Sequence, residues 1–175
     1  VALFGDEVVP FELLDLQSGR TSYGHRFHSP GAIELANAGE YPTRMENDGH
    51  VIADFNRRKA MIEEQAIAAG KQAGGTAQID PGLLNEVTAL VEWPEALTGS
   101  FDEDFLRVPQ EALISAMEEH QKYFSVLDAN GKLIFKDMIV AVRNSGQGFV
   151  DYLWPKPGEE APQPKISFVK GFAPW

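Results

Sequence analysis

The chain of 175 residues contains no cysteine, so neither a disulfide bond nor a thiolate zinc site can form within it. It also lacks any apolar run near the roughly 20 residues that a membrane-spanning helix needs, which predicts no membrane contact. Its first residues lack a starting methionine and the charged-then-apolar layout of a signal peptide. We therefore expect a segment of a longer, cytoplasmic protein.

Positive charge is scarce over most of the chain. Residues 1–125 contain 9 Lys and Arg against 21 Asp and Glu, whereas residues 126–175 contain 6 against 5. Because an acidic surface repels phosphate, we expect no strong nucleic-acid binding by this chain alone. The change of composition near residue 126 predicts two domains, over residues 1–128 and 129–175.

The apolar pattern predicts strands first and helices afterwards, which indicates the α+β class with an antiparallel or mixed sheet and three to four helices. Two strands are expected within residues 1–16 and a third over residues 21–27. Helices are expected over residues 51–69, 80–93 and 109–120, with a short strand after the second. Asp80 and Pro81 form a helix start, while Gly70 and then Gly74 are expected to end the first helix and begin a flexible loop.

Two patterns compete between residues 123 and 143. Asn130 and Gly131 are the pair that two-residue hairpin turns prefer, and they lie between two apolar runs. In contrast, Ile134, Met138 and Val142 are spaced by four residues, as on one face of a helix. We favour a helix over residues 133–143, with a strand as the alternative. A β-hairpin tail over residues 148–154 and 165–172 follows.

The candidate metal ligands are few. His25 and His28 are expected on a strand, where residues three positions apart face opposite sides of the sheet. The two side chains then cannot bind one metal ion together, so we interpret them as ordinary strand histidines. His120 is expected at a helix C-terminus, where it interacts with the helix dipole. Residues 102–104 are three adjacent acids without the ligand spacing of a calcium loop, so we expect a solvated turn. No metal site and no cofactor are predicted.

Other candidate sites are equally weak. The basic run at residues 57–59 spreads around a helix and has acidic neighbours, so a solvated face is favoured over an RNA contact. The glycines at residues 70–75 lack the Gly-Lys-Ser/Thr ending of a phosphate-binding loop. Nothing has the strand-turn-helix setting of a nucleophile elbow. We expect no catalytic residues and no autonomous active site.

Five motifs in order carry a resemblance to a known family. They are FGDEVVP at residues 4–10, YGHRFHSPG at 23–31, VIADF at 51–55, LNEVTALVEWP at 84–94, and residues 101–124, which end in EHQKYF. Over about residues 1–131 the chain resembles the β subunit of bacterial glycyl-tRNA synthetase. The resemblance implies an α2β2 enzyme whose α subunit holds the ATP and glycine site, and a fold like the B3/B4 modules of phenylalanyl-tRNA synthetase.

A second resemblance covers about residues 130–175. The segments NGKLIFKDM at 130–138 and GFVDYLWPKPG at 148–158 are similar to the late half of a single Cache domain, a small-molecule sensor module. This resemblance implies a chimera, natural or designed, with Tyr152, Trp154 and Lys170 as ligand-binding candidates. Packing of the tail's aromatic residues as a hairpin is the simpler interpretation of Tyr152 and Trp154.

The leading functional hypothesis is structural. The chain is expected to be a non-catalytic part of a ligase β subunit that scaffolds contacts with the α subunit and with tRNA. The alternative is a sensor fragment that binds a small carboxylate or amino acid.

Overall fold

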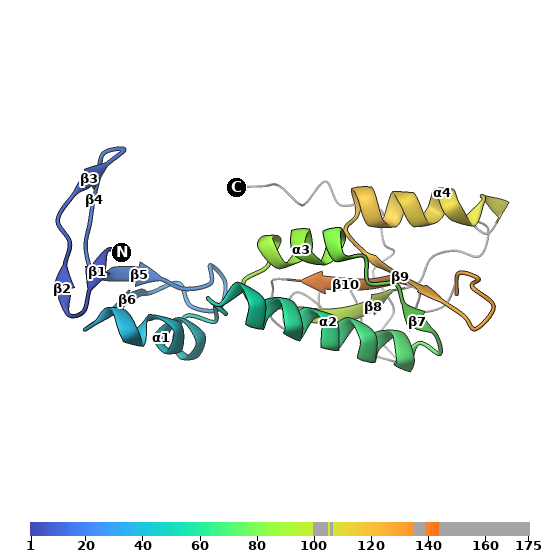
Figure 1. Cartoon of the computed structure of the whole chain (residues 1–175), viewed down its shortest axis with the longest axis horizontal. Helices are drawn as coiled ribbons and strands as arrows, with labels where there is room; N and C mark the ends of the chain where they lie inside the picture. Colours follow the sequence, from blue (N-terminus) through green and yellow to red (C-terminus); the bar gives the residue numbers. More distant parts are fainter. Residues whose placement is uncertain (100–104, 106, 135–138, 144–175) are drawn as a thin grey trace, which may run out of the picture. The chain divides into compact units, whose positions relative to one another are not determined.

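Three antiparallel strand pairs begin the chain. They are β1 (Leu3–Phe4) with β2 (Glu7–Val8), β3 (Glu12–Leu13) with β4 (Leu16–Gln17), and β5 (Thr21–Tyr23) with β6 (Ala32–Glu34) (Figure 1). The computed structural model describes residues 1–99, 105, 107–134 and 139–143, all within one compact unit, Val1–Asn144. Residues 1–17 thus form four short strands instead of the two expected, because the chain reverses both at Gly5 and at Leu14.

The first helices lie in a stretch for which the sequence pattern predicted nothing. A 3-10 turn, η1 (Ala38–Glu40), is capped by Asn37 and leads into α1 (Tyr41–Asn47). Their apolar residues pack on β6 in a small core of buried Ile33, Leu35 and Met45. This core is separate from the main one, and its tertiary contacts stabilise a helix that is too short to be stable alone.

Helix α2 (Phe55–Gln72) begins later and ends later than expected. The Asp54 side chain accepts the backbone N–H of Arg57 as an N-cap, so the preceding residues 51–54 stay outside the helix. Gly70 does not end the helix but lies buried within it. The chain turns at Gly74, which has a φ of +84°, and enters β7 (Thr76–Ala77) directly. The expected flexible loop is therefore a tight turn.

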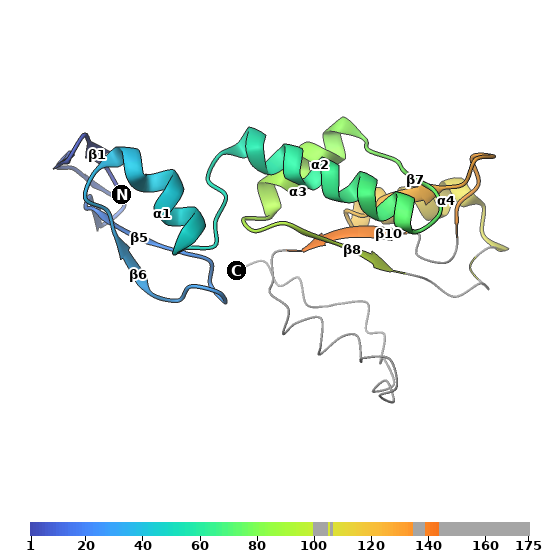
Figure 2. The same cartoon turned by 90° about the horizontal axis from the view of Figure 1, so that it is seen from below.

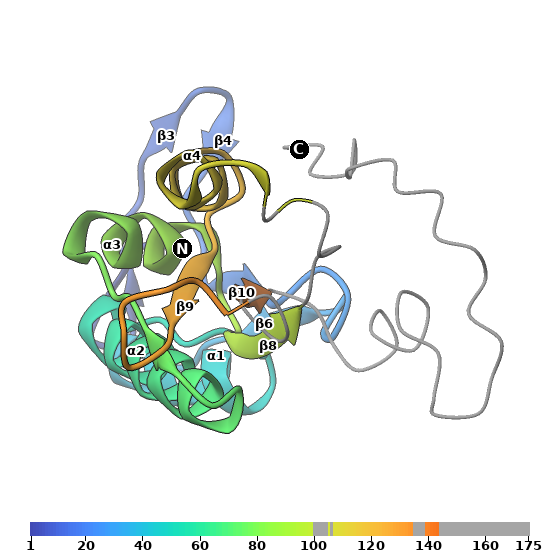
Figure 3. The same cartoon turned by 90° about the vertical axis from the view of Figure 1, so that its right-hand side faces the viewer.

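The predicted start of α3 (Pro81–Leu90) is confirmed. Asp80 accepts the backbone N–H of Leu83 at 2.8 Å, with Pro81 in the first helical position. The expected inner face is buried except for Leu90, whose side chain is 60% exposed. Helices α2 and α3 pack against each other and cover the same side of the central sheet (Figures 2 and 3).

The central sheet has four antiparallel strands in the order β7-β9-β10-β8. Strand β8 spans Glu95–Gly99, β9 spans Phe124–Leu127, and β10 spans Ile139–Arg143. The favoured helix over residues 133–143 is therefore wrong where the structure describes it. Five residues of β10 pair with β8, from Ile139 opposite Gly99 to Arg143 opposite Glu95. A run rich in β-branched residues fits this place between two strands.

The chain does reverse at Asn130 and Gly131, but not through the expected two-residue turn, because only Gly131 has a positive φ and the N–H of Asp128 donates to the carbonyl of Lys132. Gly131 has a φ of +74°, and Leu127 bridges to Leu133 across the turn. The carboxylate of Asp128 accepts the backbone N–H groups of Lys132 and Asn130. These hydrogen bonds lower the pKa of Asp128 below its ordinary value, and the bond from Lys132 has the largest effect.

The last helix, α4 (Gln110–Ser115), continues into one π-helical turn, η3 (Ala116–His120). His120 is exposed in this last turn, as expected for a residue near a helix C-terminus. Gln110 ties α4 to the hairpin, because its side chain accepts the N–H of Leu133 and donates to the carbonyl of Gly131. The α+β class with four helices is confirmed over the described residues.

In the parts of the chain that the structure describes, no helix has both the length and the apolar character needed to cross a membrane.

Candidate functional site

Several residues singled out in the sequence have no structural description. Tyr152, Trp154 and Lys170, the ligand-binding candidates of the tail, lie outside the described residues, as does the acidic stretch 102–104. Their proposed roles stay predictions.

The histidines are arranged differently from the strand geometry expected. His25 and His28 follow β5 in a loop, and their ring centroids lie only 4.6 Å apart. The argument that they face opposite sides of a strand is therefore wrong. The ring of His50 lies 5.4 Å from that of His28, and Trp93 lies 5.2 Å beyond His50. Sequence reasoning missed His50 and Trp93, because nothing local connects four residues spread over 69 positions.

The rings of His25, His28, His50 and Trp93 form a row that we call the ring column, and this column joins three separate segments of the chain. The N–H of His25 donates to the carbonyl of Gly49 at 2.6 Å, and a Cβ on Gly24 would lie 2.6 Å from the Cα of Gly49. Only glycines allow two backbones so close. His25 is 1% exposed, and its Nδ1 accepts the N–H of Phe27. Within the described ranges no three His, Asp or Glu side chains are grouped as a metal site requires. The column therefore packs the loop after β5 onto Trp93.

The basic run is largely occupied in structural contacts, so the expectation of a solvated face is wrong for its central residue. Arg58 donates from Nε to the carbonyl of Thr88 at 3.0 Å and from Nη1 to the carbonyl of Ile52. It thereby binds a carbonyl in the last turn of α3. Its neighbour Arg57 pairs with Glu46, and these hydrogen bonds hold the pKa of that carboxylate below its ordinary value.

Other described cations are also engaged with acceptors of the chain itself. The guanidinium of Arg20 donates to the carbonyls of Leu35, Ala36 and Asp6. Arg44 pairs with Asp48, and Lys122 pairs with Glu86. Guanidinium groups held in this way are poorly placed to bind a run of phosphates.

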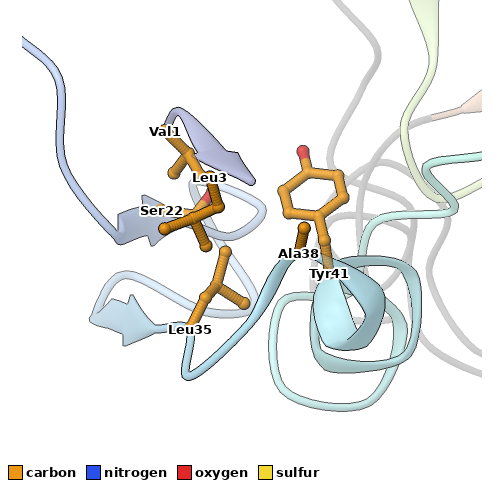
Figure 4. Close-up of a pocket in the computed structure, with 6 residues that line it drawn as sticks. All are labelled: Val1, Leu3, Ser22, Leu35, Ala38 and Tyr41. Carbon is orange, nitrogen blue, oxygen red and sulfur yellow. The ribbon is translucent and has the colours of Figure 1, made fainter. Parts of the chain in front are cut away.

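A pocket of about 380 Å³ opens beside β1, β5 and α1 (Figure 4). Six residues line it: Val1, Leu3, Ser22, Leu35, Ala38 and Tyr41. Figure 4 shows Tyr41 facing Leu3 and Ser22 across the opening. Ligand sites of this size usually add several convergent polar groups to an apolar wall. Of the side chains that line this pocket, only those of Ser22 and Tyr41 are polar, and none is a carboxylate or an imidazole. The pocket holds no acid–base pair.

The N-terminal strands expose an unusual amount of apolar surface. Three residues at the end of the β3–β4 hairpin form a set that we call the hairpin-tip cluster: Leu13, Leu14 and Leu16, exposed by 62%, 85% and 72%. Phe11, at the base of the hairpin, is 53% exposed. Contiguous exposed apolar residues on a soluble chain commonly mark an interaction site. The sequence signal was available, because the run FELLDL at residues 11–16 places apolar residues on both faces of the hairpin.

The tip of this hairpin is conformationally strained. Leu14 and Asp15 have φ values of +52° and +60°, the left-handed pair of a two-residue hairpin turn. Asn and Gly favour these positions, whereas a bulky residue there costs about 1–2 kcal/mol. Strained residues of this kind concentrate at functional sites. The hairpin is nevertheless closed at its base, where the N–H of Ser18 donates to the carbonyl of Phe11 at 3.0 Å.

Comparisons with known proteins agree with the β-subunit resemblance. Residues 1–149 match the family model described as glycyl-tRNA synthetase beta subunit. The glycine–tRNA ligase beta subunit of Chromohalobacter salexigens is 53% identical over 144 residues, 82% of this chain and 20% of that protein. That of Hahella chejuensis is 50% identical over 134 residues, 77% of this chain and 19% of that protein. The chain thus spans about a fifth of the length of these curated relatives.

The family match also continues further than the motifs predicted. It reaches residue 149, whereas the resemblance was expected to fade near residue 131. The beta subunit of Desulforamulus reducens likewise aligns over 151 residues, at 44% identity, covering 86% of this chain and 21% of that protein. The Cache resemblance and the chimera inferred from it are not supported by these comparisons.

Proposed function

Because the chain belongs to the glycyl-tRNA synthetase beta subunit family, we propose that it is a non-catalytic part of such a subunit. In the whole enzyme, which joins glycine to tRNA, it scaffolds contacts with the α subunit and with tRNA. The observation that carries this proposal is the family match over residues 1–149, together with 53% identity over 144 residues to one curated beta subunit. An enzyme of protein synthesis works in the cytoplasm, which the cysteine-free composition suits.

The chemistry of the described residues supports a non-catalytic role. Aminoacylation needs positive groups that face the ATP phosphates and groups that move protons. Arg57 is held by a carboxylate and Arg58 by two carbonyls. The rings of His25, His28 and His50 pack in a row that ends on Trp93. The pocket beside α1 offers two hydroxyls and no acid–base pair.

The charges favour contact with protein over broad contact with RNA. Residues 1–125 have a net charge of −12, and many of the Arg side chains in this part bind acceptors within the chain. Any tRNA affinity of the isolated chain should be weak and should fall quickly as salt rises. The exposed apolar side chains of the N-terminal hairpins, in contrast, suit a protein partner.

A segment exchange tests the proposed function. In the Chromohalobacter salexigens beta subunit, the matching fifth of the chain is replaced by residues 1–149 of this protein, the range of the family match. The chimera, combined with the α subunit, should still charge tRNA with glycine. A beta subunit from which the segment is deleted serves as the matched control and should lose activity. A chimera that assembles normally but charges no tRNA would contradict the proposal.

A second measurement separates scaffolding from catalysis. The isolated 175-residue chain should show no glycine-dependent exchange of pyrophosphate into ATP, relative to a heat-inactivated sample. Exchange above that background would show an active site that the proposal denies.

A further inference from the structure

We propose that the β3–β4 hairpin is a docking element that inserts the hairpin-tip cluster into a groove on another protein. The floor of this groove is apolar and its rim carries Lys and Arg. The inference rests on the proposed function, which supplies the candidate for that protein, the α subunit of the ligase.

The apolar surface comes from the exposed side chains of the tip. Leu14 and Leu16 are 85% and 72% exposed, and Leu13 is exposed beside them. Figure 1 shows β3 and β4 extending beyond β1 and β5, so the neighbouring strands do not cover the tip. Bulky apolar side chains clustered in this way act as anchors at protein interfaces, where a groove removes them from water.

The charges of the hairpins define the rim of the partner. Residues 1–17 contain four acids, Asp6, Glu7, Glu12 and Asp15, and neither Lys nor Arg. Asp15 lies in the turn itself, next to Leu14, and Glu12 lies in β3. Complementary charges steer such an encounter, so the matching rim is basic. The same acids repel the phosphates of RNA, and two copies of this hairpin would bring like charges together.

The conformation of the tip supports a selected role for its apolar residue. Leu14 occupies a left-handed position with a φ of +52°, where Asn or Gly would be less strained. A sequence that served only to close the turn would have no reason to place leucine there. The base of the hairpin is fixed by the hydrogen bonds between Phe11 and Ser18, so the tip is preorganised for binding.

The test measures binding of the 175-residue chain to the purified α subunit of the Chromohalobacter salexigens ligase by titration calorimetry. The test variant carries Leu14→Asn and Leu16→Asn, and Asn at residue 14 suits the left-handed turn. The matched control is Leu90→Asn, because Leu90 is also an exposed leucine, at 60%, but lies on α3. The double variant should raise the Kd by about tenfold or more, while the control should leave the Kd unchanged.

A variant with one reversed charge tests whether the rim of the partner's groove is basic. Glu12→Lys should weaken binding at low salt and weaken it less at high salt, because screening removes the unfavourable contact with a basic rim. A photo-crosslinking residue at position 14 should label an α-subunit segment with apolar residues flanked by Lys or Arg, and the same probe at position 90 should not.

Each other outcome overturns the inference. If the double variant binds the α subunit as tightly as the wild type, the hairpin is not the docking element, although the proposed function stands. If the wild type itself does not bind, the α-subunit contact of the proposed function fails too. Self-association that the variant abolishes would make a second copy the occupant, and loss of tRNA binding in a gel shift would make RNA the occupant. A lower Tm of the variant would mean that the chain covers its own hairpin.

Discussion

Gly70→Ala sets helix propensity against packing. Gly70 lies near the end of α2, where alanine would favour the helix by about 1 kcal/mol if the surroundings were open. They are not open, because a Cβ at residue 70 would lie 2.6 Å from the backbone nitrogen of Ala77 and 3.0 Å from its Cβ. Ala77 belongs to β7 and is paired with Val126 of β9, so its backbone cannot move independently.

The expected sign follows from these two opposing effects. Overpacking by one methyl group costs about 1–3 kcal/mol, and a contact with paired backbone belongs to the upper part of that range. After the gain in helix propensity is subtracted, we expect the free energy of unfolding to fall by about 1–2 kcal/mol. For a chain of this size the Tm should then fall by about 2–8 °C.

Urea unfolding followed by circular dichroism measures the change, with Gly31→Ala as the matched control. A Cβ at Gly31 has no neighbour within 4 Å, so the control should be neutral or stabilise by about 0.4–1 kcal/mol through the unfolded state. A Gly70→Ala variant as stable as the wild type, or more stable, would refute the argument. It would show that β7 can shift away from α2.

Three further substitutions test individual contacts. Arg58→Ala should lower the free energy of unfolding by about 1–3 kcal/mol, because two carbonyls lose their donor. The control Arg57→Ala removes an exposed ion pair and should shift the midpoint of urea unfolding much less. Asp80→Ala should cost about 0.5–2 kcal/mol, measured in the same way, through loss of the N-cap of α3. The largest cause of the lowered pKa of Asp128 is the hydrogen bond from the N–H of Lys132. The ionised Asp128 therefore contributes its full share to the free energy of unfolding above about pH 4, and this share is lost as the pH falls through the lowered pKa. Asp128→Asn should therefore show a flatter fall of stability on acidification, and equal slopes for the two proteins would contradict this reasoning.

The candidate site was only partly visible in the sequence. The apolar run of the hairpin, including Leu13 and Leu16, is evident in the amino-acid sequence. Its exposure cannot, because a strand with two apolar faces equally suits a buried position. The left-handed turn at Leu14 breaks the usual preference for Asn and Gly, so turn chemistry gave no signal there.

The sequence by itself determined the features that depend on residues a few positions apart. Asp80 and Pro81 begin a helix, and the chain reverses at Asn130 and Gly131, because caps and turns are closed by hydrogen bonds between near neighbours.

Only the tertiary structure decided the features that need a distant partner. The spacing of Ile134, Met138 and Val142 suits a helix, but residues 139–143 form β10 because β8 and β9 supply its paired neighbours. Gly70 stays within α2 because β7 packs against it, and His50 meets His28 and Trp93 because two backbones approach closely at Gly24. In each case the contacts that stabilise the arrangement come from segments far apart in the chain, and a local pattern does not contain them.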